Sequence, residues 1–224
     1  TTAGLIYENH NPNALMEQCV VRGGIAGPNP VGLAGLWAGN IDQCFVEANV
    51  YSDYSSSVTQ ELYAAGLVGT LKGSGSIKNS GFIGNITAIS GGALCGLVLE
   101  MKGIAENCFA RANMEQDNPV GAISGLFDAV SNSDNIKNCY FAGQIIGGET
   151  THGLARSYGV MGANEPSCYF ATNEGVVDVW AVSVSEEELK LPSTLVGWDF
   201  DIWEIDPEYN RGLALLRCLK PYMK

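Results

Sequence analysis

Small or apolar residues alternate with polar residues over short stretches that recur along the chain. Each stretch begins at a Cys or Ser, at positions 19, 44, 80, 108, 139 and 168. Two, four and six residues further on stand mostly small or apolar side chains, such as Val46, Ala48 and Val50. The positions between them carry polar side chains, such as Glu47 and Asn49. Alternation with a period of two is typical of a β-strand with one buried face, so each stretch predicts a strand.

This strand phrase is an internal repeat. Its copies follow one another at intervals of 25, 36, 28, 31 and 29 residues. A second, glycine-rich phrase precedes each copy, at 3–6, 32–35, 66–69, 93–96, 122–125 and, in degenerate form, 153–156. The pattern predicts an all-β fold, a β-solenoid (β-helix) of about six coils in which like residues stack about 4.8 Å apart. We expect the glycines to serve corners with positive φ and close contacts between coil walls.

Acidic residues become denser after about residue 175, which divides the chain into a solenoid of repeats over 1–175 and a C-terminal cap over 176–224. Ser185 and Glu188 have the spacing of a capping box, so a short helix is expected there. The alternating run 197–205 predicts strands. A solenoid needs a cap over its last apolar coil, and Trp180, Trp198 and Trp203 are large enough to provide one.

Composition excludes two classes of partner. The chain has 12 Lys and Arg against 24 Asp and Glu, a formal charge of −12, which disfavours binding to nucleic acid or to anionic lipid surfaces. No apolar run is long enough for a membrane helix, so membrane insertion is not expected. Because residues 3–6 already form a repeat phrase, we expect the chain to belong to a longer polypeptide whose upstream part covers the first coil.

The repeats resemble a known family. GLVG at 66–69 followed by IKNS at 77–80, and IKNCYFAG at 136–143, are similar to the GLUG-motif repeats of bacterial surface adhesins and of the non-catalytic parts of secreted IgA-specific metallopeptidases. The resemblance covers roughly residues 3–175 and extends to the tail that closes such arrays. It implies a repeat architecture and a secreted or cell-surface location in bacteria, more firmly than it implies a ligand.

The seven cysteines offer no metal cluster and no cofactor site, because they show no CxxC or Cys/His spacing. Five of them, Cys19, Cys44, Cys108, Cys139 and Cys168, share one inward column. Disulfides between neighbouring coils are permitted by distance, but free buried thiols that pack as small hydrophobic groups are the favoured interpretation. Cys95 and Cys218 lie outside the column, and no pairing is assigned to them.

Catalytic signatures are weak. The two histidines, His10 and His152, are expected in loops, and the sequence has neither a Gly-x-Ser-x-Gly elbow nor a His-Glu-x-x-His motif. No enzyme activity is therefore expected. The carboxylates at 199, 201, 204, 206 and 208 are of the type that binds Ca²⁺, but their alternation with apolar residues favours a solvated strand face.

The strongest candidate for ligand binding is the column one residue beyond the cysteines. It holds Phe45, Phe109, Tyr140 and Tyr169, interrupted by Gly81. By the same alternation it faces outward, so three consecutive coils should carry an aromatic stripe of Phe109, Tyr140 and Tyr169 beside the amides of Asn113, Gln144 and Asn173. Aromatic faces flanked by amides suit a sugar ring or a protein partner. Two alternatives remain open: a ladder that stiffens the wall or is covered by loops, and a one-residue bulge that turns the rings inward.

The leading functional hypothesis is a non-catalytic structural or adhesion module of a secreted or cell-surface bacterial protein, which binds a glycan or a protein of a host or neighbouring cell. A second hypothesis is a polysaccharide-degrading β-helix enzyme, or an accessory repeat domain of a secreted peptidase. A viral receptor-binding fibre is the third.

Overall fold

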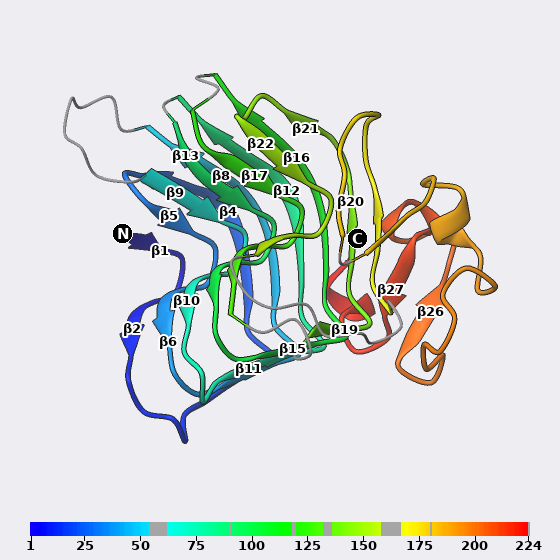
Figure 1. The fold of residues 1–224 in the computed structure, drawn as a ribbon. Coiled ribbons are helices and arrows are strands. Elements are labelled where there is room, and N and C mark those ends of the chain that lie inside the picture. Colours follow the sequence, from blue (N-terminus) through cyan, green and yellow to red (C-terminus); the bar gives the residue numbers. More distant parts are fainter. Residues whose placement is uncertain are drawn as a thin grey trace.

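The computed structural model describes residues 1–53, 62–89, 91–117, 120–131, 136–157, 167–179 and 181–223. The fold is all-β, 52% strand and 5% helical, and its parallel sheets form a β-solenoid of about five turns (Figure 1). The predicted number was six. Among the described residues the sixth repeat contributes strands to three of the four walls, so it adds a partial turn.

Each complete coil has four sides, and each side belongs to one parallel sheet. The first sheet contains β1 (Thr2–Ala3), β5 (Pro30–Val31), β9 (Leu62–Ala65), β13 (Gly92–Cys95), β17 (Ala122–Ser124) and β22 (Thr150–His152). The second contains β2 (Ile6–Asn9), β6 (Ala34–Trp37), β10 (Val68–Leu71), β14 (Val98–Met101), β18 (Phe127–Val130) and β23 (Ala155–Ser157). The third contains β3 (Leu15–Glu17), β7 (Asn40–Asp42), β11 (Ser76–Lys78), β15 (Ile104–Glu106) and β19 (Ile136–Lys137).

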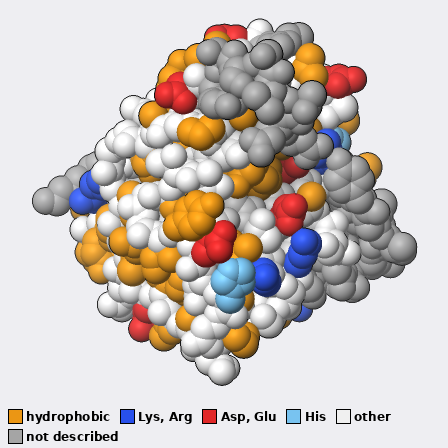
Figure 2. Space-filling model, turned by 90° about the vertical axis from the view of Figure 1, so that its left-hand side faces the viewer, with side chains coloured by type: hydrophobic (Ala, Val, Ile, Leu, Met, Phe, Trp, Pro, Cys, Tyr) orange, Lys and Arg blue, Asp and Glu red, His pale blue; other side chains and the backbone are white. Residues whose placement is uncertain are grey.

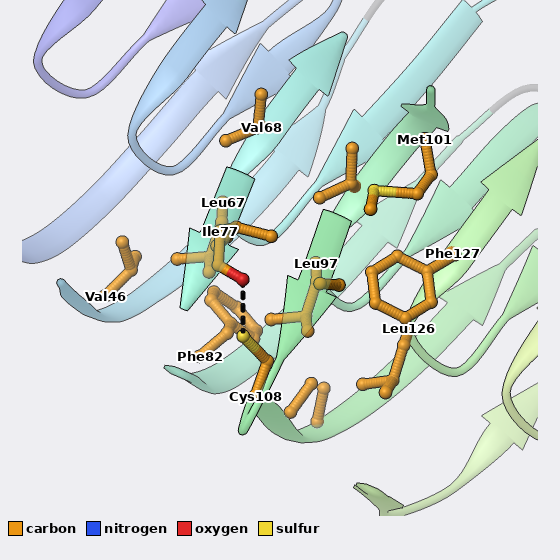
Figure 3. Packing of buried hydrophobic residues seen from close by; sticks show 14 of the residues in the cluster. Val46, Leu67, Val68, Ile77, Phe82, Leu97, Met101, Cys108, Leu126 and Phe127 are labelled. Atoms are coloured by element: carbon orange, nitrogen blue, oxygen red, sulfur yellow. Dashed lines mark hydrogen bonds between the residues drawn. The ribbon is translucent and has the colours of Figure 1, made fainter. Parts of the chain in front are cut away.

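The fourth sheet, called the broad wall below, is formed by the strands that follow the Cys or Ser positions. It contains β4 (Val20–Gly27), β8 (Phe45–Ser52), β12 (Gly81–Ala88), β16 (Phe109–Gln116), β20 (Tyr140–Ala142), β21 (Ile145–Ile146), β24 (Tyr169–Ala171) and β25 (Val182–Ser183). Its strands pair in register, so that repeat equivalents are direct neighbours: Val46 pairs with Phe82, and Phe82 pairs with Ala110. These three side chains face inward and are fully buried, which confirms the predicted alternation. Figure 3 shows hydrophobic side chains packed in the core between the walls.

The glycine phrase stacks in a register that differs in part from the prediction. Val68 pairs with Val98, and Val98 pairs with Phe127. The true fourth and fifth copies are therefore 96–99 and 125–128, three residues later than the sequence pattern indicates. The shift brings the glycines at 32, 66, 96, 125 and 153 into one column. A Cβ on Gly66 would lie 2.0 Å from the carbonyl oxygen of Gly96, so the column is glycine because adjacent coils touch there.

A second corner uses amide residues. Gln18, Gln43, Asn79, Asn107 and Asn138 stand immediately before the Cys or Ser positions, and all five have φ between 47° and 53°. Asparagine tolerates this left-handed conformation better than most residues. Their side chains also bridge the coils, as Asn138 donates to Asn107 at 3.2 Å and Asn107 donates to Asn79 at 3.3 Å. The expectation that glycine makes the positive-φ corners is wrong at this corner.

The cysteine column lies beside these corners, and all seven cysteines are free thiols. Four thiols of the column donate to main-chain carbonyls, those of Cys19, Cys44, Cys108 and Cys139. Cys108 also donates to Ile77 of the preceding coil at 3.5 Å (Figure 3). Ser80 replaces a cysteine and donates to Lys78 at 2.6 Å. Burial raises the pKa of the Cys44 thiol to about 12, so this group stays protonated and inert at neutral pH.

The C-terminal cap packs against the outer face of the broad wall (Figure 1). Parallel pairing continues through β25, beyond the expected boundary at 175. The cap then contains η2 (Glu188–Lys190), β26 (Trp203–Ile205), η3 (Asn210–Gly212), β27 (Ala214–Leu216) and η4 (Lys220–Tyr222). Strands β26 and β27 are antiparallel.

The structure of the cap agrees with the predictions from the sequence at two points and differs from them at one. Ser185 and Glu188 form the reciprocal hydrogen bonds of a capping box, at 2.7 and 3.2 Å, and η2 follows directly. Of the run 197–205, only 203–205 is a strand, because Asp199 accepts main-chain hydrogen bonds that close turns around 201–203. Trp198 and Trp203 are buried in the cap, while Trp180 lies outside the described residues.

Candidate functional site

The aromatic stripe faces outward from the solenoid as predicted, but it is not exposed to solvent. Phe109 and Tyr140 are 0% exposed and Tyr169 is 5% exposed. They belong to a separate apolar cluster in which the broad wall meets the cap. The expectation that these three side chains form an accessible binding surface is therefore wrong. Their outward orientation gives the cap an apolar face on which to pack, which corresponds to the covered-ladder alternative.

The packing between wall and cap is aromatic. The Phe109 and Tyr140 rings stack with centroids 5.5 Å apart and an interplanar angle of 11°. From the cap, Trp203 approaches Tyr140 at 6.0 Å and Trp198 approaches Tyr169 at 6.0 Å. Such pairs stabilise by about 0.5–1.5 kcal/mol each beyond the burial of their area. Gly81 leaves a gap in the stripe because a Cβ there would lie 2.3 Å from the Phe109 ring.

A buried polar network fixes the position of the cap. The Tyr140 hydroxyl donates to the carbonyl oxygen of Ala214 and accepts a hydrogen bond of 2.7 Å from the Asn210 amide. The Asn210 amide also donates to Ala214 at 3.0 Å, and its oxygen accepts a bond of 2.9 Å from Arg111. Asn210, itself 7% exposed, thus connects two coils of the wall with the cap. Removing any partner would leave a buried polar atom unsatisfied.

The amide half of the predicted site remains accessible. Asn113, Gln144 and Asn173 are exposed and line a cavity of ≈ 410 Å³ at the edge of the cap, which also includes Glu186 and Arg211. A neighbouring cavity of ≈ 190 Å³ shares four residues with the first and adds Arg111 and Asn85. The two cavities therefore form one groove, with the broad wall on one side and the cap on the other. We call it the wall–cap groove.

Small residues and a ladder of amides make the floor of this groove. Gly143 lines both cavities, with Ala112 and Ala171 on either side of it. Asn85 donates to Asn49 at 2.8 Å, and Asn113 donates to Asn85 at 3.4 Å. Asn173 accepts the main-chain N–H of Ile145 at 2.8 Å, which holds its side chain in place. The floor is consequently a preorganised polar surface with little side-chain bulk.

Two arginines and one carboxylate set the charge of the groove. Among the described residues, neither Arg111 nor Arg211 has an acidic partner within 4.0 Å. Burial lowers the pKa of the Arg111 guanidinium, and the positive charge of Arg211 lowers it further, whereas Glu186 acts in the opposite direction. Arg111 stays protonated at any ordinary pH. The groove thus carries one partly buried cation, Arg111, and one exposed cation, Arg211, together with the exposed carboxylate of Glu186.

The alternation that begins at Cys108 accounts for Arg111 on the outer face of the broad wall, but no local pattern indicates Arg211 or Glu186. Glu186 follows β25, which pairs with the wall, and Arg211 belongs to the cap turn that Asn210 bonds to the wall. Asn210 and Arg211 are consecutive residues in the left-handed region, with φ of 46° and 57°. The Asn-Arg-Gly sequence at 210–212 is a turn signal, but a turn signal does not say what the turn contacts.

A second group of reactive side chains lies on the first two sheets, on the face opposite to Ile123 and Phe127, which point into the solenoid core. Ser124 pairs in register with His152, and Arg156 binds Asp128 at 2.8 Å nearby. His152 is on β22, so its expected place in a loop is wrong, whereas His10 follows β2 in an exposed loop. Burial lowers the pKa of the His152 imidazole. Ser124 is 0% exposed, so its hydroxyl does not face solvent as a nucleophile must.

Two carboxylates of the acidic run of the cap, Glu204 and Asp206, pair with neighbouring bases. Glu204 pairs with Arg217 and Lys220, each at 2.8 Å, and Asp206 pairs with Lys220 at 2.8 Å. Within the described ranges, no group of three or more His, Cys, Asp or Glu is placed to hold a metal ion. The same part of the chain contains no helix long and apolar enough to cross a membrane.

The N-terminal end of the solenoid is a second surface of note. All four sheets end there, at β1, β2, β3 and β4, and β4 pairs only with β8 among the described strands. Leu5, Tyr7 and Leu15 are between 51% and 60% exposed on this coil. Figure 2 looks onto this end and shows hydrophobic side chains gathered on it. An unprotected parallel edge of this kind favours pairing with another strand.

Fold and groove together define the chain as a capped parallel β-solenoid with a polar groove beside its cap. Comparisons with protein-family models, with curated proteins and with solved structures give no match for this chain. The similarity to GLUG-motif repeats therefore stays a prediction from the residues themselves.

Proposed function

We propose that this chain is a non-catalytic adhesion module of a secreted or cell-surface bacterial protein, and that it binds a glycan or a protein partner in the wall–cap groove. The observation that carries the proposal is the groove itself, where exposed Asn113, Gln144 and Asn173 meet the unpaired Arg111 and Arg211. Polar groups that converge in a cavity of several hundred Å³ are typical of ligand sites.

The solenoid suits such a role because it holds the groove on rigid elements. Asn113 lies on β16, whose eight residues all pair with β12 in unbroken register. Amide side chains both donate and accept hydrogen bonds, so they match the hydroxyl groups of sugars and the polar groups of a protein surface equally well. The GLUG-like phrases add the expectation of a surface location.

A binding experiment tests the adhesion proposal. Purified chain is applied to a glycan array and to surface proteins of candidate host cells, with Asn113→Ala as the test variant. Asn49→Ala is the matched control, because Asn49 belongs to the same amide ladder and is also exposed, but does not line the groove. Retention that Asn113→Ala weakens and Asn49→Ala leaves unchanged supports the proposal. Retention that neither substitution affects contradicts it.

The enzyme alternative is tested on the same preparations. Incubation with neutral and acidic polysaccharides, followed by assays for reducing ends and unsaturated products, detects glycosidase or lyase activity. Turnover that survives purification to homogeneity would replace the adhesion proposal with a polysaccharide-degrading activity. Retention on a glycan without turnover supports a binding module.

A further inference from the structure

The cations of the wall–cap groove indicate which ligand it accepts. The chain as a whole is acidic, with a charge of −12, yet the groove contains two arginines and Glu186 as the only carboxylate that lines its two cavities. On the same cap, Arg217 pairs with Glu204 at 2.8 Å, so acids that neutralise arginines are present a short distance along the chain. The unpaired state of Arg111 and Arg211 is therefore a local feature of the groove.

The position of Arg211 is held by a conformation that its neighbours enforce. Two consecutive residues other than glycine in the left-handed region cost about 1–2 kcal/mol each. The side chain of Asn210 offsets this cost through its buried hydrogen bonds to Tyr140, Ala214 and Arg111. One of these bonds is to Arg111 itself, so Asn210 places the main chain of Arg211 beside Arg111. Strained backbone that is fixed in this way is common at binding sites.

We propose that the wall–cap groove binds a carbohydrate that bears a carboxylate group, with the carboxylate held by Arg111 and Arg211 and the sugar hydroxyls held by Asn113 and Gln144. This inference rests on the proposed adhesion function and names the ligand class for the same groove.

The chemistry of the lining residues matches this ligand. Guanidinium groups bind carboxylates through two parallel charge-assisted hydrogen bonds. Arg111 is partly buried, which strengthens such bonds, while Arg211 is exposed and free to approach a ligand from the cap side. The small residues Ala112, Gly143 and Ala171 let a sugar ring approach the floor closely. The stripe aromatics are buried under the cap, so recognition in the groove is by polar groups and charge. The two cavities of the groove hold two cations and one carboxylate, Glu186, while an adjoining cavity beside the same two arginines is also lined by Glu47 and Glu208.

The inference is tested on an array of oligouronates and sialylated oligosaccharides, each printed beside its carboxyl-reduced form. The test variant is Arg211→Gln, and the matched control is Arg217→Gln, which removes one positive charge from the same cap outside the groove. We expect selective retention on the carboxylate forms, weakened about tenfold or more by Arg211→Gln and unchanged by Arg217→Gln. Glu186→Gln should strengthen retention, because it removes the opposing charge.

Other outcomes separate this inference from the adhesion proposal. Equal retention on the acidic and the reduced forms, weakened by Asn113→Ala, overturns the carboxylate inference and leaves the adhesion proposal intact. If the chain is retained on no carboxylate-bearing sugar but binds a protein partner through Asn113, the carboxylate inference is also overturned and the adhesion proposal stays intact. An Arg211→Gln variant that binds acidic sugars as the unmodified chain does also overturns the inference, once its urea unfolding midpoint shows that it is folded.

Discussion

The glycine column at 32, 66, 96, 125 and 153 makes the sharpest prediction about the fold. At Gly66 a Cβ would lie 2.0 Å from the carbonyl oxygen of Gly96 and 2.6 Å from Cγ of Phe82. The φ angle of Gly66 is outside the left-handed region, so the backbone alone would accept alanine. The effect of an alanine substitution at Gly66 therefore reports on the contact between coils, because the backbone conformation at this position does not require glycine.

The expected destabilisation follows from what must move. Overpacking a well-packed interior costs about 1–3 kcal/mol, and here one of the two neighbours is main chain that does not rotate away. Separating the coils also lengthens the hydrogen bonds from Gly66 N–H to Cys95 and from Leu67 N–H to Leu97, now 3.1 and 3.0 Å. Each contributes about 1 kcal/mol. Gly66→Ala should therefore lower the free energy of unfolding by about 3–5 kcal/mol.

Urea unfolding followed by far-ultraviolet circular dichroism measures the effect as a shift in midpoint at constant slope. Gly73→Ala is the matched control, because Gly73 is exposed in a turn and its nearest Cβ contact is at 3.5 Å. The control should stay within about 0.5 kcal/mol of the unmodified chain or gain slightly. If Gly66→Ala unfolds at the same midpoint as Gly73→Ala, the coils do not touch at this column and the register is wrong.

Three further predictions concern the hydrogen bonds of Tyr140 to the cap, the partly buried His152 and the unpaired edge of β4. Tyr140→Phe removes two buried hydrogen bonds and should cost about 1–2 kcal/mol in urea unfolding, whereas exposed Tyr51→Phe should cost nothing measurable. Burial lowers the pKa of His152 in the folded state. The stability that its neutral imidazole contributes is therefore present above the ordinary pKa of histidine and is lost as the pH falls below it. His152→Asn should thus flatten the decline in stability between pH 7.5 and 5, as measured by urea unfolding at each pH. Gly24→Lys, on the unpaired edge of β4, should reduce concentration-dependent self-association in sedimentation velocity; a chain that is monomeric at every concentration would contradict this.

The sequence was sufficient for the strand pattern because alternation is a local property. Val46 and Glu47 point to opposite faces of β8 whatever lies around them. The register of the glycine phrase was harder to predict, because apolar Leu94 and Ile123 resemble the leucine of the phrase three residues too early. Main-chain pairing of Leu97 with Leu126 resolves the ambiguity.

Only part of the candidate site could be predicted from the sequence, and the reason differs from the one that applies to the glycine phrase. Alternation correctly placed Phe109 and Tyr140 on the outer face. Whether that face is exposed to solvent depends on which other parts of the chain pack against it. The cover comes from Trp203, 94 positions after Phe109 and 63 after Tyr140 in the sequence, and no local pattern encodes that contact. The amides remained accessible because they lie beyond the edge of the cap. Arg211 joins them only because Asn210 bonds to the wall.

The same contacts that hide the aromatic stripe therefore build the groove. One side of the groove is β16 with Asn113, and the other is the turn with Arg211, so the groove exists only while the cap is docked. A ligand that bridges the two sides binds the docked form alone. Mass action then requires that it stabilise cap docking, by about 2.7 kcal/mol at a concentration one hundred times its dissociation constant. Ligand binding and cap stability are therefore linked, and a ligand that binds the chain without protecting the cap against unfolding binds outside the groove.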